Sequence, residues 1–109
     1  MTDWRDFPKL ELHLHLEGAA PPLLVRRLAA EKGLDMVGVY DEAGHYNSND
    51  FTSFLRTYER VSTVFSTPDD YRALTEAVLT ECANNGVIYA EIFLSPTSLG
   101  YDPAKWTDY

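Results

Sequence analysis

The first regular pattern along the chain is an alternation of leucine with ionisable residues. From Lys9 to Glu17, every second position is leucine, and the positions between hold glutamate or histidine. Because successive side chains of a strand point to opposite faces, this period of two predicts a strand over residues 9–17. One face of the strand would be all leucine and the other wholly ionisable. Gly18 and the Pro21-Pro22 pair end it.

Three later segments carry apolar residues at the three- and four-residue spacing of amphipathic helices. The first covers residues 22–32 and opens with a proline, which suits the first turn of a helix. The second places an aromatic stripe on one face, made of Phe51, Phe54, Leu55, Tyr58, Val61 and Phe65. The third starts at Thr67-Pro68-Asp69-Asp70, a typical helix start, and ends at Asn84-Asn85-Gly86.

The segments between and after these helices complete the pattern. Residues 34–50 are rich in turn-forming residues and have no sustained period, so we expect a long loop there, in a position to act as a lid. Residues 87–94 are apolar at nearly every position and rich in β-branched and aromatic side chains. Strands of this kind are buried on both faces in parallel sheets. Residues 102–106 are typical of the start of another helix.

The order of strand, helices and strand predicts an α/β fold built from βα units. Two parallel strands leave unpaired edges and do not make a closed, stable sheet. We therefore expect residues 1–109 to be the N-terminal part of a single longer barrel domain, incomplete in this chain and inactive alone. Eight such units form a (β/α)8, or TIM-type, barrel of about 250 residues.

Composition narrows the classes of function. Of the 109 residues, 45% are hydrophobic and 24% are charged, as in globular proteins. The formal net charge of −8 repels phosphate backbones and anionic lipids, so we expect neither nucleic acid nor membrane as a partner. The single cysteine, Cys82, cannot form an internal disulfide, and the sequence shows no signal peptide or membrane span. These features favour a cytoplasmic protein.

The candidate chemistry lies in the pair His13 and His15. On a strand, both imidazoles point to the same side and can converge on one metal ion. Zn²⁺ accepts neutral imidazole and, in catalytic sites, keeps a position open for a water molecule whose pKa falls to roughly 7. The pair lies at the carboxyl end of its strand, where parallel barrels assemble their active sites.

Two histidines are an incomplete ligand set, and the alternative is a pair of hydrogen-bonded histidines in an ordinary core. The flanking acids Glu11 and Glu17 are expected on the same face. Because burying four unpaired ionisable groups is costly, this row favours the metal. His45 lies alone in the loop and is expected to be exposed.

Two stretches of the chain carry a resemblance to a known family. They are PKLELHLHLEGA at residues 8–19 and GVIYAEI at residues 86–92, the latter followed by Ser95-Pro96. In this order and at this separation, they closely resemble the opening motif and the second-strand motif of the adenosine deaminase family of metal-dependent hydrolases. The resemblance covers nearly the whole chain.

The resemblance implies a zinc-dependent barrel that deaminates a purine nucleoside by hydrolysis, converting adenosine to inosine and ammonia. His13 and His15 match the zinc ligands of the first motif, and His15 also lies beside the substrate. Glu17 matches an acid that contacts the sugar hydroxyl, and Phe54 and Tyr58 match a helix that lines the substrate pocket. The general acid and the other metal ligands come from later strands in the family, so no catalytic residue is expected in this segment.

Several alternatives stay open. From the residues alone, Glu17 can be a solvated acid at the barrel rim, and Phe54 and Tyr58 can belong to an ordinary core. Glu17 and Phe93 stand where animal adenosine deaminases carry aspartate and arginine, which resembles bacterial branches that act on adenosine, free adenine or modified purine nucleosides. Deamination of adenine or of a modified adenosine is therefore one alternative. The others are a metal hydrolase of phosphoesters or cyclic amides, and a non-catalytic interaction module derived from a barrel.

Overall fold

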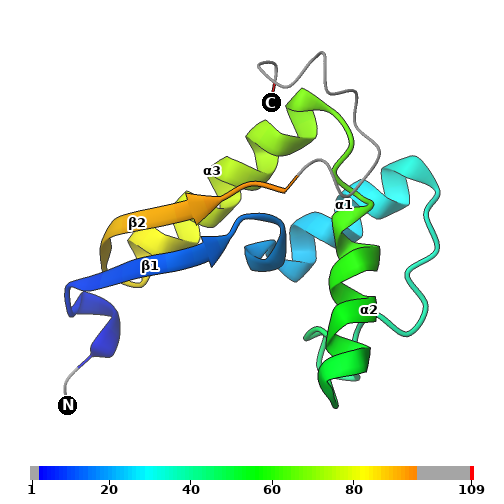
Figure 1. Ribbon diagram of the computed structural model, residues 1–109, viewed down its shortest axis with the longest axis horizontal. Helices are drawn as coiled ribbons and strands as arrows, with labels where there is room; N and C mark the ends of the chain where they lie inside the picture. Colours follow the sequence, from blue (N-terminus) through cyan, green and yellow to red (C-terminus); the bar gives the residue numbers. More distant parts are fainter. Residues whose placement is uncertain (1–2, 96–108) are drawn as a thin grey trace.

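The structure is a computed structural model, and it describes residues 3–95 and 109. Two parallel strands pair side by side, and the chain between them forms three helices. The elements in chain order are η1 (Trp4–Asp6, a 3-10 turn), β1 (Lys9–His15), η2 (Glu17–Ala19, a 3-10 turn), α1 (Pro22–Lys32), α2 (Phe51–Ser62), α3 (Pro68–Asn84) and β2 (Val87–Phe93). The α3 helix runs behind the strands, whereas α1 and α2 lie beyond their carboxyl ends (Figure 1). The predicted α/β class with parallel strands is confirmed.

The helices begin and end where their capping residues place them. Pro22 opens α1, and Gly33 closes it in the left-handed region at φ 67°, a conformation that glycine adopts without strain. Asp50 caps α2 and Thr67 caps α3, each within a reciprocal capping box. All three predicted helices are confirmed, although Phe65 lies beyond the end of α2.

The core lies between the helices and the carboxyl end of β1. Leu16 is buried just after the strand, and Val64 and Phe65 are buried just after α2. The other buried apolar residues are Ala20, Val25, Leu28, Ala29, Val39, Val61, Tyr71, Leu74 and Val78. The third helix buries Tyr71, Leu74 and Val78 at the predicted helical spacing, whereas Cys82, one turn further along, is partly buried.

The loop over residues 34–50 packs onto this core. Within it the structure shows turns and one antiparallel bridge, between Tyr40 and Tyr46, so the predicted long loop is confirmed. The Tyr46 hydroxyl donates to the carbonyl of Ala20 at 2.5 Å, and the guanidinium of Arg26 lies 4.3 Å from the centre of the Tyr40 ring. These contacts fix the loop as one wall of the core.

β1 is shorter than its sequence pattern predicts. Leu16 takes helical dihedral angles and begins the η2 turn, so the strand ends at His15. Glu17 therefore lies in a turn and leaves the strand face that carries His13 and His15. The predicted row of four ionisable side chains on one face is wrong for this reason.

β1 also contains an irregularity in its pairing with β2. Between Glu11 and Leu14, β1 advances one residue more than its partner, which moves the following side chains to the opposite face. Glu11 and Leu14 consequently line the same hollow as Val78 of α3, whereas Leu10 and Leu12 are exposed. The predicted all-leucine face is wrong.

β2 is covered on one face. It pairs in parallel with β1, as predicted, but Ile88 is 72% exposed and Phe93 is 46% exposed. The expectation that residues 87–94 are buried on both faces is wrong for the described part of the chain, where α3 packs against one side of the sheet. The helix expected to start at residues 102–106 lies outside the described residues.

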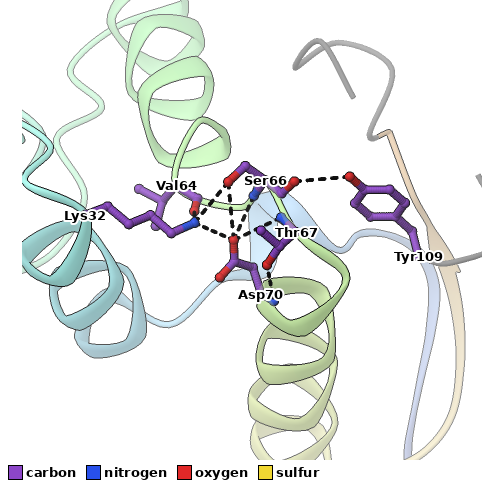
Figure 2. Close-up of polar contacts among 6 residues, drawn as sticks. All are labelled: Lys32, Val64, Ser66, Thr67, Asp70 and Tyr109. Carbon is purple, nitrogen blue, oxygen red and sulfur yellow. Dashed lines mark hydrogen bonds and ion pairs between the residues drawn. The ribbon is translucent and has the colours of Figure 1, made fainter. Parts of the chain in front are cut away.

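The amino end of α3 is fixed by a buried carboxylate (Figure 2). Asp70 Oδ2 accepts the backbone N–H groups of Ser66 and Thr67, both at 3.0 Å, and pairs with the ammonium group of Lys32 from α1. Lys32 also donates to the carbonyl of Val64 at 2.6 Å. Burial raises the pKa of the Asp70 carboxyl, but the hydrogen bonds from Lys32 and the two amides outweigh it and hold the pKa below its ordinary value. This ion pair ties α1 to α3.

We expect Asp70→Asn to lower the free energy of unfolding by about 2–3 kcal/mol, because it leaves the Lys32 ammonium partly buried without its anion. Asp69→Asn is the matched control: Asp69 is exposed in the same helical turn, and its loss costs at most about 1 kcal/mol. Urea unfolding of the purified protein measures both. Equal effects of the two substitutions would contradict the role of the ion pair.

The pH dependence of unfolding gives a second readout of the same ion pair. The folded pKa of Asp70 is lowered, so its stabilisation is complete above the ordinary carboxyl value of 3.8 and is lost as the pH falls through the folded value. The difference in stability between wild type and Asp70→Asn should therefore narrow below about pH 4.

Candidate functional site

The two histidines of β1 converge at the carboxyl end of the strand. His13 Nε2 and His15 Nε2 are 3.1 Å apart, and both residues are exposed. Phe93 of β2 stacks on His13, with ring centres 4.5 Å apart, and its ring centre lies 5.6 Å from that of His15. The structure thus brings together the two ring nitrogens that the sequence predicts on one side of the strand.

The separation of the two nitrogens suits a pair of metal ligands. Imidazole nitrogens bind zinc at about 2.0–2.1 Å, so two of them around a tetrahedral ion lie about 3.3 Å apart. The same separation fits a hydrogen bond between one protonated and one unprotonated ring nitrogen. Residues 3–95 and 109 contain no group of three or more His, Cys, Asp or Glu side chains placed to hold a metal ion. A complete ligand set around His13 and His15 therefore requires residues outside that part of the chain.

Glu17 is buried where the ends of β1 and β2 meet α3. The residue is 1% exposed, and its Oε1 accepts the hydroxyl of Tyr71 at 3.1 Å and the backbone N–H of Ser95 at 2.8 Å. Oε2 makes no hydrogen bond to the described residues. The interpretation of Glu17 as a solvated rim acid is therefore wrong, and its contact with a substrate stays a prediction.

Tyr71 is a site residue that the sequence pattern does not reveal. It occupies one position of the apolar stripe of α3, where the helical period indicates ordinary core. Only the rule that a buried tyrosine hydroxyl needs a polar partner could have pointed to it. Burial, and then the negative charge of Glu17, raises the pKa of the Tyr71 phenol, so it is a protonated donor at neutral pH.

A cavity of about 200 Å³ adjoins Glu17. It opens between η2, the loop and α2, and its lining is mostly apolar; the lining residues are Glu17, Gly18, Tyr46, Ser48, Phe54, Thr57, Tyr58 and Val61. The rings of Phe54 and Tyr58 lie on one side of α2 with centres 6.3 Å apart. The Thr57 hydroxyl donates to the carbonyl of Asn47 at 2.7 Å, which ties α2 to the loop. Both predicted aromatic residues thus line a cavity rather than a closed core.

Gly18 links the histidines to this cavity. A Cβ atom at Gly18 would lie 2.9 Å from Cε2 of Tyr58 and 3.7 Å from Cβ of His15. Only a glycine lets the turn after β1 approach the Tyr58 ring so closely. Gly18, which lines the cavity, thus lies next to the backbone side of His15, and the predicted contact of His15 with a substrate stays a prediction. His45 is exposed, as predicted, and its Nδ1 lies 3.8 Å from Asp41 within the loop.

Comparison with known proteins reveals clear relatives. The model of the adenosine deaminase family matches residues 8–103. An adenine deaminase of Sinorhizobium medicae is 49% identical over 88 residues, which are 81% of this chain and 27% of that protein. An adenine deaminase of Mesorhizobium japonicum is 44% identical over 103 residues, which are 92% of this chain and 32% of that protein.

A solved structure matches the fold as well. The crystal structure of adenine deaminase from Arthrobacter aurescens superposes with a TM-score of 0.71 at 35% sequence identity, over 87% of this chain and 31% of that one. This chain thus spans about a third or less of the length of these relatives. Among the described residues, no helix is both long and apolar enough to span a membrane. The sequence motifs, the parallel strands and these matches together show that the chain belongs to the adenosine deaminase family.

Proposed function

We propose that this chain is part of a metal-dependent adenine deaminase, which removes the 6-amino group of adenine by hydrolysis and releases hypoxanthine and ammonia. The observation that carries the proposal is the pair of histidine nitrogens 3.1 Å apart, next to a largely apolar cavity with a buried carboxylate at its edge. An apolar pocket with a few convergent polar groups, beside residues that can hold a metal ion, suits the hydrolysis of a flat heterocycle.

Adenine, rather than adenosine, is the substrate that the observations favour. Adenosine is the first expectation from the sequence, but the relatives described above are named adenine deaminases. Free adenine carries a ring N–H where the nucleoside carries its sugar. A buried carboxylate such as Glu17 suits an N–H donor of this kind, because a nearly dry acceptor gains most from a direct hydrogen bond.

The fold that we propose for the whole protein is a (β/α)8 barrel, of which residues 1–109 form one part. The relatives are about three to four times as long as the segment that they share with this chain. The open face of the sheet carries Leu10, Leu12, Ile88 and Phe93, all exposed among the described residues. Further strands that close a barrel would cover such a face. The remaining metal ligands and the general acid would then come from those strands.

Each of the described site residues has a separate proposed role. His13 and His15 would hold the metal through Nε2; zinc and other divalent ions such as manganese or iron suit imidazole, and when bound such an ion lowers the pKa of water for hydrolysis. Phe93 packs against His13 and limits the rotation of its ring. Phe54 and Tyr58 offer flat apolar surfaces to the purine and exclude water from it.

Substitution of the histidines tests the proposal. In the complete protein, His13→Ala should remove most of the bound metal and lower kcat for adenine more than about 100-fold, because the site loses a ligand. His45→Ala is the matched control, since His45 is exposed in the loop, and it should keep both metal and activity. Elemental analysis of the purified proteins and an ammonia-release assay measure the two effects.

The same assay separates the alternatives. Retained metal and turnover in His13→Ala would contradict the metal assignment. Faster ammonia release from adenosine than from adenine would show that the substrate is a nucleoside and not the free base. Phosphate release from a simple ester would indicate a different hydrolase, and a metal-free wild type without any of these activities would indicate a non-catalytic module.

Gly18→Ala tests the cavity as the purine site. The new methyl group would lie 2.9 Å from Cε2 of Tyr58 and should displace its ring, so we expect KM for adenine to rise several-fold with little change in kcat. In a Tyr58→Leu background the contact is absent, and the same substitution should have little further effect. Steady-state kinetics of the four proteins measure this. An equal rise of KM in both backgrounds would exclude Tyr58 as the cause.

A further inference from the structure

The hydroxyl of Tyr71 contacts the carboxylate at the edge of the proposed purine site. Tyr71 lies in the first turns of α3, is buried, and donates to Glu17 Oε1 at 3.1 Å. The backbone N–H of Ser95 donates to the same oxygen at 2.8 Å. Tyr71 does not line the cavity, and its hydrogen bond to Glu17 joins it to the cavity lining.

The position of the Tyr71 ring is fixed from several sides. Its ring meets that of Phe65 at 6.4 Å and 65°, and that of Tyr109 at 5.3 Å and 86°, both edge-to-face. The Tyr109 hydroxyl donates to the carbonyl of Ser66 at 3.1 Å, directly beside the Lys32–Asp70 ion pair (Figure 2). Asp70 immediately precedes Tyr71 and anchors the backbone of the same helical turn. The phenol is therefore held in one orientation before any ligand arrives.

This arrangement makes the two oxygens of Glu17 unequal. Oε1 already accepts two protein donors, whereas Oε2 is buried and has no donor among the described residues. A buried carboxylate oxygen without a donor is costly, and a bound N–H group would remove that cost. Glu17 also lines the cavity next to Gly18 and Tyr58.

We propose that Tyr71 is a positioning residue: by occupying Oε1 it leaves Oε2 of Glu17 as the one acceptor for a ring N–H of the purine, and so it sets the affinity of the site for the free base. The inference rests on the proposed function. Without the hydroxyl, Glu17 keeps only the Ser95 amide on Oε1, and its carboxylate can turn so that either oxygen faces the ligand. The oriented acceptor is then lost, although the carboxylate itself is still present.

Tyr71→Phe in the complete, metal-loaded enzyme tests this. We expect KM for adenine to rise about 10-fold while kcat changes less than about 3-fold, because the lost interaction is made equally in the ground state and the transition state. Tyr40→Phe is the matched control: its hydroxyl is buried without a hydrogen-bond partner among the described residues, and it lies outside the cavity lining. Metal content and the melting temperature are measured in parallel to compare the folds.

A second background separates positioning from a merely structural role. In Glu17→Ala, the residue through which Tyr71 acts is absent, so adding Tyr71→Phe should change kcat/KM less than about 2-fold. A structural role would keep its full effect in that background and would overturn the proposal. If Glu17→Ala does not fold, the split between KM and kcat in Tyr71→Phe decides: an unchanged KM, or a fall in kcat alone, overturns it.

The outcomes also distinguish this inference from the function on which it rests. A wild-type enzyme that deaminates no purine overturns the proposed function and the inference together. An active wild type whose Tyr71→Phe variant behaves like Tyr40→Phe overturns the inference alone.

Discussion

A buried carboxylate needs hydrogen-bond donors, and in this protein the donors of Glu17 come from distant parts of the chain. Tyr71 follows Glu17 by 54 residues and Ser95 follows it by 78. A buried carboxylate without a hydrogen-bond partner costs several kcal/mol, which is a large part of the stability of a domain. The segments that carry Glu17, Tyr71 and Ser95 are therefore held in one arrangement. The end of β1, the first turns of α3 and the residue after β2 therefore meet at a fixed point, and the proposed site is built around it.

The buried carboxylate of Asp70 lies next to Tyr71 in the sequence and helps to fix the position of the helix that carries it. The Lys32–Asp70 pair joins the last residue of α1 to the first turn of α3, and Asp70 also accepts the amides of Ser66 and Thr67. Breaking one partner of such a pair is far more costly than the net value of the pair, so its main effect is to fix geometry. Tyr71 is the next residue along the helix. The Lys32–Asp70 ion pair and the Tyr71–Glu17 hydrogen bond are thus made by neighbouring residues of α3. Together they link the position of α1 to the orientation of Glu17 at the cavity.

Local rules predicted the helices well, whereas the site depends on contacts that local rules do not contain. Helix starts at Pro22 and Thr67 follow from capping chemistry within a few residues, and the structure confirms them. The irregular pairing of β1 arises only against β2, more than 70 residues away, and it cannot be read from the alternation of leucines. The packing of the Tyr71 ring on Phe65 and the hydrogen bond of its hydroxyl to Glu17 are likewise tertiary contacts. The motif around His13 pointed to the right family, but not to these contacts.

The break in the alternation of β1 separates the two kinds of polar residue in space. Had the strand continued to residue 17, Glu17 would lie on the same face as His13 and His15, and its carboxylate would compete with the imidazoles for a bound metal or pair with them. Instead, Leu16 turns the chain into η2, and the carboxylate enters the space between α2 and α3. The two imidazoles stay exposed and close to each other at the sheet. The histidine pair and the carboxylate therefore occupy separate places, because Leu16, a single residue with helical dihedral angles, lies between His15 and Glu17.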